Sequence, residues 1–211
     1  MIYYMLYSQS KPKKLFQLWS ILMLRKKDTL APIPDELMER CKRAAKRRTQ
    51  ENLAKSWWKD SKKSTEPQET IELRGIVCEA SMALTLGVDI EQVFRPGNRS
   101  AVKGTDLGDL NFDGVLMDIK GVRYSYSNLL VSPTKKNTPI DIFVLVHEDE
   151  KWGNRFLGAI PFHKAFGQKI ILQDGTDLGN GLRQDQLLNL DDAIREAKEE
   201  RVKIIRALSR D

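Results

Sequence analysis

The stretch from Gly108 to Lys120, Gly-Asp-Leu-Asn-Phe-Asp-Gly-Val-Leu-Met-Asp-Ile-Lys, carries the strongest structural signal in the chain. At its centre stands Asp113-Gly114, a dipeptide that favours a two-residue type I′ turn, because both turn positions need a positive φ. We therefore predict a β-hairpin in which Phe112 pairs with Val115.

The predicted hairpin sorts its side chains onto two faces. In this register Asp109 lies opposite Asp118, and a turn one residue earlier would pair Asp109 with Leu116 and leave it diagonal to Asp118. In both registers Asp109 shares a face with Asp118 and Lys120, because strand side chains alternate. The opposite face is apolar and consists of Val115, Met117 and Ile119.

Two carboxylates on neighbouring strands need a physical reason to be there. Their repulsion costs up to about 1 kcal/mol relative to a neutral pair. A divalent cation removes that cost, since hard cations prefer carboxylate oxygens. A metal ion held by such carboxylates, with a lysine beside it, can cleave a phosphodiester. The alternative is a solvated strand face on which Asp118 and Lys120 form an ordinary surface pair.

Charge is spread unevenly along the 211 residues. The whole chain has 35 Lys and Arg against 29 Asp and Glu, a formal net charge of +6. Residues 1–63 contain 16 basic and 6 acidic residues, a net charge of +10, and the remainder carries −4. This asymmetry indicates a nucleic acid or another anionic partner.

Several signals bear on the compartment. Cys41 and Cys78 form no C-x-x-C pair, which favours small core residues in a reducing cytoplasm over a disulfide or zinc scaffold. The apolar segment 15–24 is too short to span a membrane, and basic residues follow it where a cleavage site would stand. We expect a cytoplasmic protein of a prokaryotic or phage-infected cell without a membrane partner.

No GxGxxG or GxxxxGK[ST] motif supports use of a nucleotide cofactor.

Periodicity and turn residues divide the chain into two parts. Residues 1–66 form a basic extension with a helical run from Asp35 to about residue 60, and residues 67–211 form the main domain. In the domain we expect helices over 71–86, closed by Gly87, and over 191–208, with a buried central strand over 141–146. Further strands are expected near 93–94, 101–102, 129–131, 156–160 and 168–172, and 175–189 is expected to be irregular. This order predicts an α/β fold, a mixed β-sheet flanked by helices.

A glutamate in the first domain helix is a further candidate. Glu79 lies three residues after Ile76 and four before Ala83, so it borders the apolar face of that helix. It either faces the sheet, where it could complete a metal site, or faces solvent.

Glu79, Asp109 and Asp118-Ile119-Lys120 together resemble the PD-(D/E)xK nuclease superfamily. That family has an acidic residue in its first core helix, an Asp at the start of one hairpin strand and (D/E)-x-K on the next. The resemblance covers roughly residues 71–147. It is nearest to archaeal-type Holliday-junction resolvases and phage nucleases. One departure is Gly108, which stands where the family has a proline.

The resemblance implies a restriction-endonuclease-like core and a Mg²⁺- or Mn²⁺-dependent DNA endonuclease. Asp109, Asp118 and the backbone carbonyl of Ile119 would bind the metal, Glu79 would reach it directly or through water, and Lys120 would position the attacking water. A junction-resolving or phage recombination role fits within the family. The alternatives are an exonuclease of the same superfamily, a DNA-binding module without catalysis and a structural protein. A homodimer is also left open.

Other polar and aromatic residues compete for roles. Asp106 falls on the opposite face of a regular strand, and Asp113 is better used in the turn. Isolated histidines favour packing or surface roles over catalysis, and four aromatic residues could stack on bases or belong to the core; these are His147, His163, Trp57, Trp58, Tyr124 and Tyr126.

The basic helical run is the expected grip on the DNA backbone. Residues 40–63 carry ten Lys and Arg against two acids. We expect phosphate contacts from Arg43, Lys46, Arg47 and Arg48. The alternative is a solvated helix that only packs on the core through Leu37, Cys41, Ala44 and Trp57.

Overall fold

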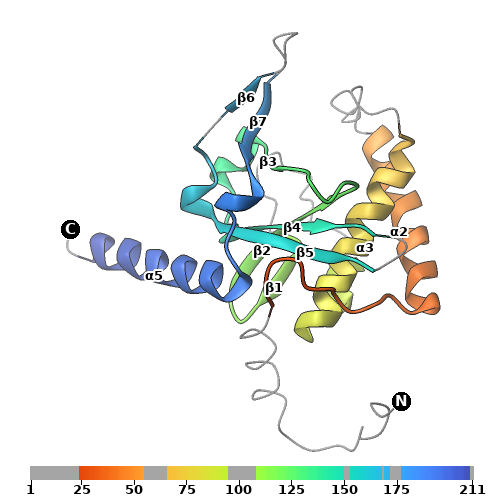
Figure 1. Cartoon of the computed structure of the whole chain (residues 1–211), viewed down its shortest axis with the longest axis horizontal. Coiled ribbons are helices and arrows are strands. Elements are labelled where there is room, and N and C mark those ends of the chain that lie inside the picture. The colour runs from red at the N-terminus through yellow and green to blue at the C-terminus, as the bar shows by residue number, and fades with distance from the viewer. Residues whose placement is uncertain are drawn as a thin grey trace, which may run out of the picture.

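The computed structural model describes residues 24–54, 66–94, 108–149, 153–167, 169–171 and 177–209. Its fold is mixed α/β, as predicted, with two separate β-sheets and flanking helices (Figure 1). The strands are β1 (Leu110–Phe112), β2 (Val115–Val122), β3 (Leu129–Val131), β4 (Ile142–His147), β5 (Arg155–Pro161), β6 (Lys169–Ile171) and β7 (Asp177–Leu182). The α-helices are α2 (Asp35–Ala54), α3 (Gln68–Leu86), α4 (Glu91–Phe94) and α5 (Leu190–Leu208), and short 3-10 helices are η2 (Pro133–Asn137), η3 (Phe162–Lys164) and η4 (Gln184–Gln186).

The larger sheet has the strand order β1-β2-β4-β5. β1 and β2 are antiparallel, β2 and β4 are parallel, and β4 and β5 are antiparallel, so the sheet is mixed. β4 lies between two strands, and five of its six residues are buried. The prediction of a buried central strand is therefore confirmed, and its continuous apolar sequence reflects burial on both faces.

Two helices cover one face of this sheet. Inward-facing residues of α2 and α3 pack with Met117 and Ile119 of β2 in one hydrophobic cluster. α3 ends at Gly87, whose φ of 64° is the left-handed conformation expected of a helix-closing glycine. The cluster includes both cysteines, which are buried and form no disulfide. The basic helix α2 thus packs against the main domain rather than apart from it.

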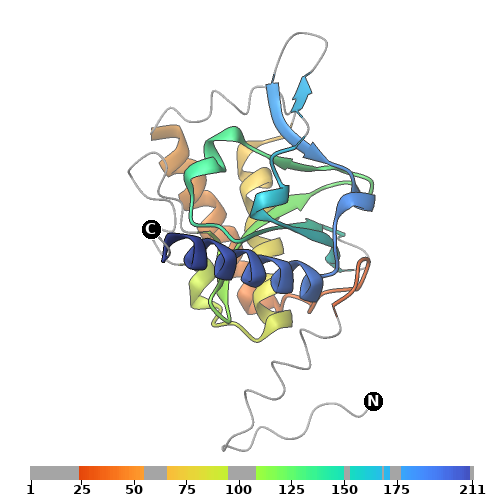
Figure 2. The same ribbon diagram turned by 90° about the vertical axis from the view of Figure 1, so that its left-hand side faces the viewer.

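The other face of the sheet packs against the smaller sheet, which has the order β3-β7-β6. Phe143 and Leu145 of β4 share a second hydrophobic cluster with Leu129, Val131 and Leu182 of that sheet. α5 starts against β5 and runs to the side of the molecule opposite α2 and α3 (Figures 1 and 2). None of the described helices is long and apolar enough to cross a membrane.

The structure corrects several local predictions. Residues 93–94 were expected in a strand and instead end helix α4. Residues 177–182 were expected to be irregular and instead form β7, which pairs on both sides. The first domain helix begins at Gln68, directly after Pro67, rather than at residue 71. The strand expected near 101–102 lies outside the described residues.

Candidate active site

The hairpin has the predicted turn and register. Asp113 and Gly114 have φ values of 50° and 75°, as a type I′ turn requires. Phe112 pairs with Val115 and Leu110 pairs with Met117. The first of the two registers considered is therefore confirmed.

Asp109 directly precedes β1 and is held alongside β2. Its backbone N–H donates to the Met117 carbonyl at 2.7 Å, and its Oδ2 accepts from the Ile119 N–H at 2.6 Å. The N–H and C=O of one strand residue point to the same side of the strand, so the Ile119 carbonyl also points to the side on which Asp109 lies. The carboxylate of Asp109 and the carbonyl of Ile119 therefore lie on the same side of β2.

The backbone of residue 108 passes close to Met117, which is possible because residue 108 is a glycine. Gly108 has a φ of +79°, and a Cβ added there would lie 2.9 Å from the Met117 carbonyl oxygen. A proline, whose φ is fixed near −65°, could not adopt this conformation. The departure from the family pattern at Gly108 thus has a local physical reason.

We expect Gly108→Ala to lower the free energy of unfolding by about 1–3 kcal/mol, because alanine is strained at positive φ and meets Met117. Urea unfolding measures the change. Gly114→Asn is the matched control: its φ is +75°, a Cβ there meets nothing within 4 Å, and asparagine tolerates this conformation. Equal losses in the two variants would contradict a special role for Gly108.

The electrostatic surroundings of Asp109 are unfavourable for a charged carboxylate. Burial, then repulsion from Glu79 and Asp118, raise the pKa of Asp109 to about 8, against the opposing effects of Lys120 and the Ile119 N–H. Asp109 thus lies within electrostatic reach of two other carboxylates, those of Glu79 and Asp118. These effects favour the protonated form of Asp109 in the metal-free chain.

Asp118 has the opposite balance. It is 1% exposed, with Lys120 Nζ 2.6 Å from its Oδ2 and Lys135 Nζ donating to its Oδ1 at 2.8 Å. Burial raises the pKa of Asp118, but the two lysines outweigh it and hold the pKa below its ordinary value. Asp118 is therefore charged and shared between two cations.

The second of these lysines was missed by the sequence reasoning. Lys135 lies on η2, in the crossover between the parallel strands β2 and β4, and its side chain is 14% exposed. Ser132 caps η2 by accepting from the Thr134 N–H. The only local signal is Ser-Pro-Thr before Lys135, which predicts a helix start but no partner for the lysine.

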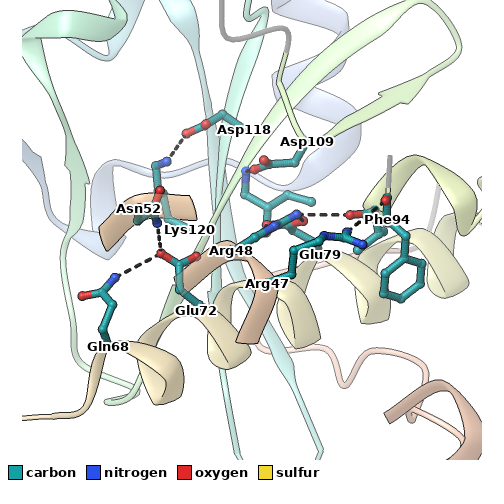
Figure 3. A network of polar contacts seen from close by, with 12 residues as sticks. Arg47, Arg48, Asn52, Gln68, Glu72, Glu79, Phe94, Asp109, Asp118 and Lys120 are labelled. Atoms are coloured by element: carbon teal, nitrogen blue, oxygen red, sulfur yellow. Dashed lines mark hydrogen bonds and ion pairs between the residues drawn. The ribbon is translucent and has the colours of Figure 1, made fainter. Parts of the chain in front are cut away.

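Glu79 faces inward rather than toward solvent. Its side chain is 4% exposed, and Arg48 donates to both of its carboxylate oxygens at 2.9 Å (Figure 3). Arg48 also donates to the Val93 carbonyl at 3.1 Å. The ion pair joins α2 to α3 and places a cation beside the carboxylates.

The predicted DNA-binding residues separate into two groups on α2. Arg43, Lys46 and Arg47 are exposed, whereas the side chain of Arg48 is only 15% exposed. Arg48 follows the buried residues Cys41 by seven positions and Ala44 by four, so helical periodicity already assigns it to the inner face. The structure therefore places Arg48 beside the carboxylates of Glu79 and Asp109. The other three basic residues lie on the outer surface of α2.

The donor set suits a hard divalent cation, although the ligands are not arranged in advance. Among the residues that the structure describes, no three Asp, Glu, His or Cys side chains form a ready-made metal site. Burial and repulsion from Glu79 and Asp118 nonetheless disfavour the charged form of Asp109, and a bound cation would offset both effects. The oxygens of Asp109, Asp118 and Ile119 match the ligands that Mg²⁺ prefers.

The remaining candidates have other surroundings. Asp113 occupies the turn and pairs with Lys198 of α5 at 2.6 Å. His147 contacts the Arg123 carbonyl at 3.1 Å, and His163 is exposed on η3. Asp106, Trp57 and Trp58 lie outside the described residues.

Comparison of the chain with protein-family models, with curated proteins and with solved structures gives no match.

Proposed function

We propose that this chain is a Mg²⁺- or Mn²⁺-dependent DNA endonuclease with a restriction-endonuclease-like core, as its resemblance to the PD-(D/E)xK superfamily implies. The observation that carries the proposal is the placement of Asp109. Its carboxylate accepts a hydrogen bond from the Ile119 N–H, on the side of β2 that the Ile119 carbonyl faces. Burial, with Glu79 and Asp118 nearby, raises the pKa of Asp109 to about 8. Mutually repelling carboxylates beside a lysine are a costly arrangement that metal-dependent phosphodiester cleavage uses.

Each residue has a defined part in this proposal. Asp109, Asp118 and the Ile119 carbonyl would hold the metal, and Glu79 would join them directly or through water. A bound divalent cation supplies a water of lowered pKa and stabilises charge on phosphate oxygens. Lys120, the more exposed of the two lysines on Asp118, would orient that water or donate to a phosphate oxygen. Lys135 would keep Asp118 charged and in position.

One observation favours a second candidate function. Asp118 is matched by two lysines and Glu79 by Arg48, so much of the cluster is charge-compensated without a metal. Such a network could serve only to join α2, α3, β2 and η2. The chain would then be a DNA-binding module or a structural protein, and a direct assay of cleavage must decide.

We expect purified protein to nick supercoiled plasmid DNA in Mg²⁺ or Mn²⁺, and Asp118→Asn to reduce the rate by at least about 100-fold, because the amide is a poor metal ligand. Ca²⁺ should support binding but little cleavage. Agarose gels with time points measure the rate. Covalently closed circles also separate an endonuclease from an exonuclease, since a circle has no end to attack.

Asp113→Asn is the matched control for this assay. It lies on the same hairpin, and asparagine tolerates its positive φ as well as aspartate does. Its activity should equal that of the wild type. Cleavage that persists in EDTA, or an Asp118→Asn variant as active as Asp113→Asn, would contradict the proposed mechanism.

The exposed basic face of α2 is proposed to grip the phosphate backbone. We expect replacement of Arg43, Lys46 and Arg47 by alanine to weaken binding to all DNA sequences. The slope of log affinity against log salt concentration should become shallower by about one to three units, at about 0.9 for each phosphate that the variant no longer neutralises. Fluorescence anisotropy at several salt concentrations measures the slope, with the inactive Asp118→Asn protein as the background.

The control for this experiment lies on another helix. Lys203 and Arg206 of α5 are also exposed, and their replacement by alanine should leave the slope unchanged. An unchanged slope in the folded α2 variant would assign the grip to another surface.

A further inference from the structure

Two tyrosines form an exposed aromatic stack just beyond the candidate active site. The loop that contains them follows the carboxyl end of β2, the strand that carries Asp118 and Lys120. Tyr124 is 48% exposed and Tyr126 is 77% exposed. Their ring centroids lie 5.3 Å apart with an interplanar angle of 12°. These rings stack on each other and leave much of their aromatic surface to solvent, so they do not act as core residues.

The loop is held in a defined shape. The side-chain amide of Gln184 donates to the Ser125 carbonyl at 2.6 Å and to the Ser127 carbonyl at 2.9 Å. The Ser127 N–H donates to the Tyr124 carbonyl at 3.0 Å. The exposed rings therefore stand on a backbone that other elements fix, which lowers the entropic cost of binding a ligand.

The tyrosine stack has a cation beside it and lies close to the candidate active site along the chain. The Arg123 guanidinium carbon lies 5.4 Å from the centroid of the Tyr124 ring. Lys120 and Tyr124 are four residues apart, so their Cα atoms are separated by no more than about 14 Å. That upper limit is roughly four times the spacing of about 3.4 Å between phosphates along one strand of duplex DNA. A strand with a phosphate at Lys120 could thus place a nearby base on the rings.

We propose that Tyr124 and Tyr126 form a stacking platform for unpaired bases, so that the preferred substrate is DNA with a single-stranded segment close to the cleaved bond. This inference rests on the proposed nuclease function and narrows its substrate class. Aromatic rings can stack on any base, because every base has a π-face. The bases of an intact duplex are already stacked on each other and are therefore not free to stack on the tyrosines. The platform therefore distinguishes unpaired from paired DNA without reading sequence.

Binding measurements test the platform separately from catalysis. We would use the Asp118→Asn protein with fluorescein-labelled dT20 and with a 20-base-pair duplex, at one salt concentration in Ca²⁺. Tyr124→Ala with Tyr126→Ala should weaken binding of dT20 by at least about five-fold and of the duplex by less than about two-fold. Tyr124→Phe with Tyr126→Phe should bind dT20 like the background protein. Leu130→Ala, which removes another exposed apolar side chain on β3, should change neither affinity.

The outcomes separate this inference from the proposed function. Equal losses on both DNAs, no loss on dT20, or no binding of dT20 by the background protein would overturn the platform. If the wild type nicks plasmid DNA but the alanine pair behaves like the phenylalanine pair, only the platform fails. If dT20 binding depends on the tyrosines but no metal-dependent nicking occurs, the platform stands and the nuclease proposal fails. Matching urea unfolding midpoints show that the variants are folded.

Discussion

Replacing Arg48 by methionine should lower the free energy of unfolding by about 3–5 kcal/mol, the cost of removing one partner of a buried ion pair. Methionine keeps much of the length of the side chain but leaves the buried carboxylate of Glu79 without its cation. Arg48 also lies within electrostatic reach of Asp109, so its loss further disfavours the ionised form of that carboxyl. Urea unfolding at about pH 8 without divalent ions measures the effect.

Two further variants isolate the cause. Arg43→Met on the outer face of α2 should change the free energy of unfolding by less than about 0.5 kcal/mol, as exposed substitutions usually do. Adding Glu79→Gln to Arg48→Met removes the uncompensated charge and should restore much of the loss. An Arg48→Met protein as stable as Arg43→Met would mean that the pair contributes nothing to stability.

The parts of the fold that the sequence predicted are those with strong local signals. Asp113-Gly114 specified the turn, and through it the register of the hairpin. The continuous apolar run at residues 141–146 specified the central strand. β7 was missed because its sequence, Asp-Leu-Gly-Asn-Gly-Leu, has two glycines and no β-branched residue. It forms a strand because β3 and β6 pair with it on both sides, which no local signal reveals.

The same division holds for the candidate site. Strand alternation alone predicted the group Asp109, Asp118 and Lys120. The structure pairs Lys120 with Asp118 and places Asp109 within electrostatic reach of both. Lys135 could not be predicted in this way, because the crossover from β2 to β4 brings it to Asp118 from seventeen residues away. Arg48 was grouped with Arg47 because they are adjacent in a basic run, although they point to different faces of α2. The distant partners of a buried charge can be predicted only when the chain topology is known. The face of a helix on which a residue lies can be predicted from the helical period.

Removing the carboxylate of Asp109 should stabilise the metal-free protein, even though Asp109 is a proposed metal ligand. Folding raises the pKa of Asp109 from 3.8 to about 8, so the folded state binds this proton more tightly than the unfolded state does. The contribution of Asp109 to stability is therefore greatest below about pH 4 and is lost as the pH rises through about 8. An asparagine at this position cannot ionise. The Asp109→Asn variant should therefore become increasingly stable relative to the wild type as the pH rises from about 4 to about 8. The gain should reach the order of a few kcal/mol above about pH 8.

Metal binding should depend on the same proton. Below about pH 8 a cation must displace the proton from Asp109, so the apparent affinity of the wild type for Mg²⁺ should rise about ten-fold per pH unit between about pH 6 and 8. Asp109→Asn should bind Mg²⁺ weakly and without this slope, whereas Asp113→Asn should keep the wild-type slope. Urea unfolding from about pH 4 to 9 in EDTA gives the stability difference, and calorimetric titration in buffers of different ionisation enthalpy counts the protons released. If Asp109→Asn and the wild type have parallel stability curves and no proton is released on Mg²⁺ binding, then Asp109 ionises normally and the carboxylates do not share a site.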